Sequence, residues 1–173
     1  AKRPVLISNV QNLDAPDVAR GKWTCDPIGL LSEAEAQHVN SQLSALRRDT
    51  GAEVAVVLVE DITHWYPWET KLRGYGSLAK DLFDRWGIGR RGHNDGVLLM
   101  LFRSGRRVEV RTGAGVQVAL PDDWVVRVLQ QRLMLPHFKR GEHAKGIVAG
   151  VEQICKRIRS PPPPPPVVVR LVP

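Results

Sequence analysis

Several features that mark other protein classes are scarce or missing in this sequence. Its 173 residues contain only two cysteines, Cys25 and Cys155, which form neither a CxxC pair nor a zinc-ligand set. They could form one disulfide or remain two buried thiols, and we expect reduced thiols. The longest apolar runs, such as "VLLMLF" (97–102), have six residues, far fewer than the roughly 20 residues that span a bilayer. The sequence therefore predicts no disulfide framework and no transmembrane segment.

Signatures of common catalytic sites are also missing. No GxSxG motif places a serine nucleophile. The five histidines (His38, His64, His93, His137 and His143) show no HExxH or comparable ligand spacing. The GxG of "TGAGVQ" lacks the rest of a dinucleotide fingerprint, and a tight loop after a strand explains it better. The sequence therefore contains no serine-hydrolase, zinc-protease or dinucleotide-binding signature.

Acidic residues are outnumbered by basic ones, and the excess is concentrated. The chain has 25 Lys and Arg against 18 Asp and Glu, a net charge of +7. Between Arg85 and Arg111, seven arginines face only Asp95 and Glu109. Such a surface favours acidic partners, namely nucleic acid, anionic lipid head groups or an acidic protein face. The lack of a recognised nucleic-acid motif disfavours the first of these.

The first half of the chain has the pattern of a βαβ unit. Ser32 and Glu35 form a capping box that begins a helix over 32–50, which Gly51 ends. The runs 53–59 and 96–102 are nearly continuous in apolar residues, as in strands buried on both faces of a parallel sheet. A helix predicted over 69–86 lies between them, which indicates a right-handed crossover.

The second half predicts one more strand and two helices. Polar and apolar residues alternate over 108–112, as in an antiparallel strand with one solvent-exposed face. A helix is expected after Pro121 and should end at Pro136, and the last helix covers 141–159. The fold class is therefore α/β, a mixed β-sheet with helices on both faces.

We expect this α/β domain to cover residues 24–159, between two tails. Residues 1–23 should form an extended segment that begins at Ala1, as a processed mature form would. Residues 160–173 contain six consecutive prolines, Pro161 to Pro166, which favour a polyproline II rod. The apolar end that follows, "VVVRLV" from Val167 to Val172, is either part of a disordered tail or a segment held by a partner.

The sequence resembles the TPM-domain family through five segments that occur in the family's order. They are "DPIGLLSEAE" (26–35), "TGAEVAVVLV" (50–59), "LFDRWGIGRRGHNDGVLLML" (82–101), "RRVEVRTGAGVQVALPDD" (106–123) and "LPHFKRGEHAKGI" (135–147). The resemblance implies an α/β sandwich. Family members include thylakoid-lumen proteins linked to photosystem repair and to acid phosphatase activity. Members often continue into a transmembrane segment, where this chain has its proline run instead.

The resemblance also implies a cleft that binds a divalent cation in some members. By position, its acidic ligands correspond to Asp95 and Asp122, with Asp26 a weaker candidate, and their oxygens suit calcium or magnesium. Asp95 and Asp122 are then also the candidate catalytic residues of a metal-assisted phosphatase. If Asp95 is a surface site, Asp95→Asn should change stability by less than about 1 kcal/mol. The surrounding arginines oppose cation binding, and Asp122 also suits the first turn of a helix.

The glycine-rich stretch from Trp86 to Gly96 could bind phosphate or could be a structural turn. A phosphate loop needs glycines before a helix N-terminus, whereas these glycines follow a helix and precede a strand. We therefore predict that Gly87 and Gly89 end the helix and that the Asn94–Gly96 turn leads into the strand.

Partner contacts are expected from three parts of the chain: an aromatic loop, a basic face and the proline tail. The aromatic loop could instead cover one edge of the sheet. The candidate partner-binding residues are Trp65, Tyr66, Trp68, Arg90, Arg91, Arg106, Arg107, Pro161, Pro166, Val167 and Leu171.

Together these features predict a non-catalytic accessory or assembly subunit of an organellar membrane protein complex, respiratory or photosynthetic. The alternative is a metal-assisted acid phosphatase of the TPM family. The protein is expected at the periphery of a membrane, and its basicity favours a mitochondrial over a thylakoid setting.

Overall fold

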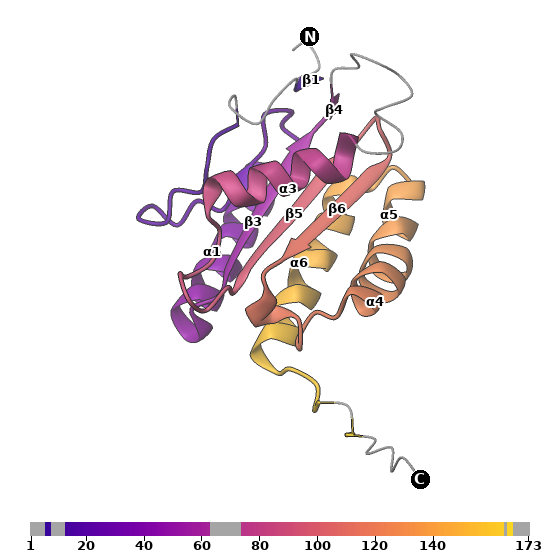
Figure 1. Ribbon diagram of the computed structural model, residues 1–173. Helices are drawn as coiled ribbons and strands as arrows, with labels where there is room; N and C mark the ends of the chain where they lie inside the picture. Colours follow the sequence, from indigo (N-terminus) through magenta and orange to yellow (C-terminus); the bar gives the residue numbers. More distant parts are fainter. Residues whose placement is uncertain (1–5, 8–12, 63–73, 165, 168–173) are drawn as a thin grey trace.

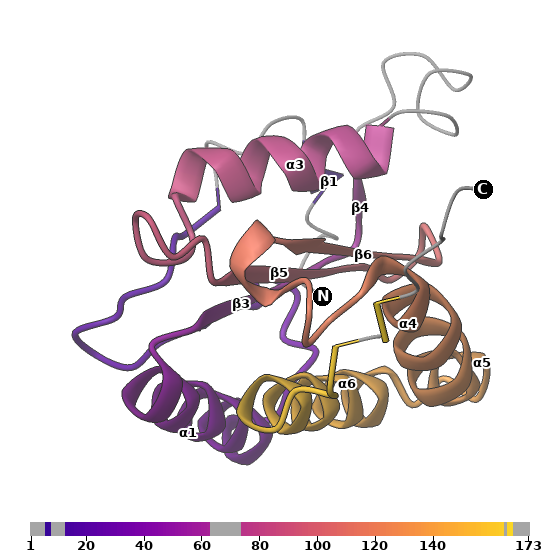
Figure 2. The ribbon, with the colours of Figure 1, turned by 60° about the horizontal axis from the view of Figure 1, so that its bottom comes forward.

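The structure is a mixed β-sheet between two layers of helices. A computed structural model describes residues 6–7, 13–62, 74–164 and 166–167 of the chain. Helix α3 (Tyr75–Trp86) covers one face of the sheet, and α1 (Glu33–Thr50) and α6 (His143–Arg159) cover the other (Figures 1 and 2). The predicted α/β class with helices on both faces is confirmed.

The main sheet has four strands in the order β2–β3–β5–β6. Strand β3 pairs in parallel with β2 and with β5, whereas β6 pairs antiparallel with β5. The strands are β2 (Thr24–Cys25), β3 (Glu53–Val59), β5 (Gly96–Phe102) and β6 (Arg107–Thr112). A separate two-stranded parallel sheet joins β1 (Leu6–Ile7) to β4 (Asp61–Ile62). The predicted parallel pairing of the two apolar runs is confirmed.

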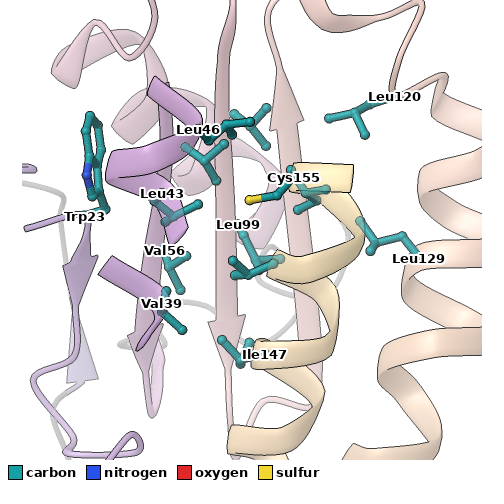
Figure 3. Close-up of a cluster of buried hydrophobic side chains, with 14 of the residues drawn as sticks. Trp23, Val39, Leu43, Leu46, Val56, Leu99, Leu120, Leu129, Ile147 and Cys155 are labelled. Atoms are coloured by element: carbon teal, nitrogen blue, oxygen red, sulfur yellow. The ribbon is translucent and has the colours of Figure 1, made fainter. Parts of the chain in front are cut away.

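The core has two clusters, one on each face of the sheet. Alternate residues of β3 and β5 point to opposite faces, and both faces are covered, so from Val54 and Val97 onward both strands are apolar. The cluster under α1 and α6 contains Val56 and Leu99 together with Trp23 (Figure 3). The cluster under α3 contains Val57 and Leu13. Leu13 and Trp23 show that the predicted extended segment before residue 24 packs against the domain.

The two cysteines lie in different clusters. Cys155 belongs to the α1–α6 cluster and Cys25 to the α3 cluster, so the sheet lies between them. Both are free and buried, as predicted. Burial raises the pKa of Cys155 to about 11 and also raises the pKa of Cys25 above its ordinary value. Neither thiol is therefore ionised near neutral pH, and neither is reactive.

Helix α1 begins and ends as its sequence predicts. The Ser32 side chain accepts a hydrogen bond from the Glu35 N–H at 3.1 Å, and the Glu35 carboxylate accepts from the Ser32 N–H at 2.7 Å. Gly51 ends the helix with a left-handed φ of 81°.

For helix α3, only the part from Tyr75 onward can be compared with the prediction, because residues 69–73 lie outside the described part of the chain.

The prediction that Pro136 ends the third helix is wrong. After the short turns η3 (Ala114–Val116) and α4 (Asp122–Trp124), the chain winds as a π-helix, η4 (Val125–Met134). At Leu135 the winding changes to a new α-helical segment, α5 (Leu135–Lys139). Pro136 lies in the first turn of α5, where a backbone N–H would have no helical partner, so proline is tolerated there.

Two glycines of α6 let η4 and α5 pack close to it. A Cβ atom on Gly146 would lie 2.5 Å from the Phe138 ring, and one on Gly150 would lie 2.7 Å from Met134 Sδ. Nearer the end of α6, the Arg157 guanidinium lies 4.4 Å from the centre of the Trp124 ring. Arg157 also donates a hydrogen bond to the Ala119 carbonyl at 2.7 Å. These contacts fix η4 and α5 against α6.

Candidate functional site

Asp95, the leading acidic candidate, is buried and fully engaged. Its carboxylate Oδ1 accepts a hydrogen bond from the Arg90 backbone N–H at 2.7 Å, and Oδ2 accepts from Arg90 Nε at 2.7 Å. Arg90 Nη2 also lies 2.6 Å from Oδ2, and Asp95 is only 7% exposed. Burial alone would raise the pKa of Asp95, but the hydrogen bonds from Arg90 outweigh it and lower the pKa. Both oxygens are thus used within the fold.

The loop around Asp95, residues 87–96, serves to join a helix to a strand. Gly87 caps α3 with a φ of 59°, and Asn94 has a φ of 51° at the entry to β5. Gly89 has a φ of 100° and donates its N–H to Glu53 Oε2 at 2.9 Å. A Cβ on Gly89 would lie only 2.5 Å from the Gly96 nitrogen. The glycines therefore permit backbone to pack on backbone, as the structural interpretation predicts.

Asp26 and Asp122 have separate surroundings. Asp26 accepts hydrogen bonds from the Leu30 and Leu31 N–H groups at 2.9 and 2.8 Å, so it stabilises the turn before α1. Asp122 is exposed in the first turn of α4. Among the described residues, no group of three or more His, Cys, Asp or Glu side chains is arranged to hold a metal ion. The structure thus does not bring Asp95, Asp122 and Asp26 together as one ligand set.

A groove lies between β6 and the helical wall of η4 and α5, and we call it the β6 groove. Its volume is about 1180 Å³. Val108 and Val110 of β6 line one side, and Val126 and Leu135 line the other. Val126 is 45% exposed and Leu135 is 39% exposed, although both are large apolar residues. The groove therefore presents apolar surface that is exposed in the described part of the chain.

Cations surround this apolar surface. Arg103 pairs with Glu60 at 2.6 Å, and Arg107 pairs with Glu109 at 2.8 Å. Arg106 and Lys139 also line the groove, and neither forms an ion pair within the described residues. The lining contains five Arg and Lys side chains against three carboxylates, so the groove favours an anionic ligand.

The predicted contact residues divide between several places. Arg106 and Arg107 line the β6 groove, whereas Arg90 is held by Asp95 and Arg91 is exposed on the loop. In the tail, Pro161, Pro166 and Val167 are exposed. Trp65, Tyr66, Trp68 and Leu171 lie outside the described residues.

Sequence reasoning missed the apolar wall of the groove. Val126, Leu135 and Phe138 are not distinguished by any sequence motif, and only their placement beside β6 identifies them. One signal was present, because Gly146 and Gly150 are four residues apart and mark a face of α6 where another helix approaches closely. Phe138 stacks on the His143 ring with centroids 5.5 Å apart, which closes one end of the wall.

The helices of the described residues are all too short or too polar to cross a bilayer. This agrees with the expectation that the chain has no transmembrane segment among these residues.

Comparison with known proteins identifies the family. Three solved structures share the fold: the N-terminal domain of a protein from P. gingivalis, the BA42 protein from the psychrophilic bacterium Bizionia argentinensis, and the N-terminal domain of cg2496 from Corynebacterium glutamicum. The first has a TM-score of 0.75 and 29% identity, covering 89% of this chain and 93% of that one.

The other two are more distant. BA42 has a TM-score of 0.58 and 17% identity over 77% of this chain and 84% of its own. The cg2496 domain has a TM-score of 0.57 and 12% identity over 83% of each chain. No curated protein matches the chain. The profile of the TPM domain matches residues 24–157, which is most of the sequence, and the chain therefore belongs to the TPM domain family.

Proposed function

We propose that this TPM domain is a non-catalytic accessory or assembly subunit of an organellar membrane protein complex and that it binds a protein partner in the β6 groove. The observation that carries the proposal is the exposed apolar wall of Val126 and Leu135, bordered by Arg106 and Lys139, which form no ion pair with any described residue. Exposed apolar surface with a polar rim is typical of protein–protein contacts. The volume of about 1180 Å³ also exceeds the roughly 300–1,000 Å³ of most small-molecule pockets.

The state of the acidic candidates supports a non-catalytic role. A carboxylate that acts on a substrate or metal needs an accessible oxygen, yet Asp95 is only 7% exposed and both of its oxygens accept hydrogen bonds from Arg90. Asp26 likewise gives both of its oxygens to backbone N–H groups.

An assembly test uses the exposed wall. In its native cells, the tagged full chain should migrate on a native gel with a large complex from the membrane fraction of the organelle, for which we favour the mitochondrion. The double substitution Val126→Asp and Leu135→Asp should leave the protein folded but no longer bound to the complex. The introduced charges would oppose burial in an apolar contact.

Val118→Asp is the matched control, because Val118 is also an exposed valine, at 61%, but does not line the groove. It should assemble as the parent does. A parent protein that migrates as a free monomer, or a doubly substituted protein that assembles normally, would contradict the proposal.

The alternative of a metal-assisted acid phosphatase has one supporting observation. Asp122 lines the same groove as Arg103, Arg106 and Arg107, and arginines can orient a phosphate. Hydrolysis of p-nitrophenyl phosphate should be measured with calcium or magnesium, using the parent and Asp122→Asn. We expect no specific turnover. Metal-dependent turnover that Asp122→Asn abolishes would establish the alternative.

A further inference from the structure

We propose that the partner enters the β6 groove as an extended segment of alternating acidic and apolar residues and that it pairs with the outer edge of β6, which no described strand occupies. This inference rests on the proposed function, because it specifies how the same groove binds its partner. Addition of a strand to an exposed sheet edge is an established mode of peptide recognition, in which main-chain hydrogen bonds supply affinity and side-chain pockets supply specificity.

The backbone of β6 is arranged to accept such a strand. The Gly113 N–H donates to the Gly96 carbonyl at 2.8 Å, which fixes the phase of the antiparallel ladder. Hydrogen-bonded and non-hydrogen-bonded pairs alternate in such a ladder. Residues Arg107, Glu109 and Arg111 therefore direct their backbone groups toward β5. Those of Val108 and Val110 point away from it.

Nothing in the described part of the chain pairs with this outer edge. The sheet ends at β6 in the strand order, and the elements beyond it are helices. Unpaired N–H and C=O groups at an edge strand form a template for another strand. The outer edge of β6 lines the groove, so an incoming strand would have space beside it.

The two sides of β6 determine the chemistry of that strand. Val108 and Val110 pack against the α1–α6 cluster and face the apolar wall that contains Val126. Arg107, Glu109 and Arg111 project to the other face, where Arg111 Nη2 donates to the Gly76 carbonyl of the α3 region at 2.7 Å. Because side chains of an added strand alternate, one set would meet valines and the other set would meet arginines.

The charge of the groove selects an acidic partner. Arg106 and Lys139 lack ion-pair partners among the described residues, so glutamate or aspartate of an incoming strand could pair with them. A second copy of this chain is a poor occupant, because each copy carries a net charge of +7 and would bring further arginines to the edge.

The winding of the opposite wall is a separate observation. Helix η4 is π-helical over ten residues, whereas π segments usually extend for a single turn and often occur at functional sites. The groove is lined by Val125, Val126, Gln130 and Gln131 of this helix. The unusual winding thus coincides with the face that a docked strand would contact.

The probe for the test is a fluorescein-labelled seven-residue peptide that alternates glutamate and valine, with binding to the full chain followed by anisotropy. We expect it to bind at least tenfold more tightly than two controls, a peptide of the same composition with its glutamates in one block and an alternating lysine–valine peptide. Equal binding of the block peptide would overturn the proposal, because charge alone would then explain the affinity.

Strand pairing is tested on the protein by Val110→Pro, with Val110→Ala as the matched control. Proline removes the outward N–H and leaves the ladder to β5 intact, whereas alanine removes the side chain and keeps the N–H. Val110→Pro should bind the alternating peptide at least tenfold more weakly than Val110→Ala. Equal affinities would contradict strand addition.

A second measurement leaves the protein unchanged. Peptides carrying N-methyl groups on one or the other alternate set of amides should differ at least tenfold in affinity, because only one set faces β6. Equal binding of both peptides would overturn the proposal. A synthetic peptide of residues 161–173 that displaces the acidic probe at lower concentration than the unlabelled acidic peptide would also overturn it.

The assembly test in cells separates this proposal from the proposed function. If Val110→Pro assembles normally while the double variant Val126→Asp and Leu135→Asp does not, strand addition fails and the proposed function stands.

Discussion

The Asp95 loop and the β6 groove are neighbours in the chain, but they differ in how much of their chemistry the fold already uses. In the loop, Asp95, Arg90 and Glu53 satisfy one another or the backbone, and glycines bring two backbone segments into contact. In the groove, by contrast, Val126 and Leu135 are exposed, and Arg106 and Lys139 have no ion-pair partner among the residues that the structure describes. A cluster of polar residues is therefore a poor guide to function until its partners are known.

The largest effect is expected in the loop, from Gly89→Ala. The residue has a φ of 100°, and the new Cβ would lie 2.5 Å from the Gly96 nitrogen, so strain and a backbone clash add. We expect a loss of at least about 3 kcal/mol of unfolding free energy in urea titrations.

Gly92→Ala is the control for this substitution. Gly92 also has a positive φ, of 82°, but a Cβ there would meet nothing within 4 Å. It should cost about 1 kcal/mol, the strain of the left-handed conformation alone. Equal losses for the two variants would mean that the loop is not tightly packed.

The next effect is expected from the carboxylate itself. Asp95→Asn should cost about 2 kcal/mol at pH 7, because it removes a charged acceptor and leaves Arg90 without its counter-ion. This corrects the expectation of less than about 1 kcal/mol, which assumed a surface site. Asp84→Asn is the control, because Asp84 pairs with Lys80 on an exposed face of α3 and should leave the urea midpoint unchanged.

The unfolding free energy that Asp95→Asn loses should also depend on pH. The folded pKa of Asp95 lies below its unfolded value near 3.8, so the carboxylate stabilises the fold above that value. As the pH falls below about 4 and through the folded pKa, the proton is bound and the stabilisation disappears. Urea titrations of the parent and Asp95→Asn should therefore converge as the pH falls from 7 toward 3. A constant difference would assign the effect to shape instead of charge.

The fold was predictable where local pattern and burial agree. The capping box at Ser32 and the apolar run of β3 each have one stable arrangement, so their positions follow from sequence. The end of the third helix was not predictable, because Pro136 can either stop a helix or occupy the first turn of a new one. Packing against Gly146 and Gly150 decides between these outcomes, and that contact depends on distant parts of the chain.

The candidate site was less predictable than the fold. Sequence position places Asp95 at the start of a strand, but its partner, Arg90, is fixed only by the turn that the loop adopts. The groove depends on where two elements lie in space, and no run of residues encodes it. Arg106 and Arg107 were nevertheless predicted as contact residues, because a concentration of like charge is visible in sequence alone.

The smallest effect is expected in the groove, from Val126→Ser. Val126 is 45% exposed, so loss of its methyl groups should change the urea unfolding free energy by less than about 0.5 kcal/mol. The adjacent Val125 is buried in the α1–α6 cluster, and Val125→Ser should cost about 2 kcal/mol or more. This neighbouring pair separates the two sides of one helix with a single type of substitution. If Val126→Ser costs as much as Val125→Ser, the groove wall is part of the core, and the contrast between a closed loop and an open groove fails. If the costs differ as expected, Val126 is apolar for a reason other than folding, which is the condition that a partner-binding surface must meet.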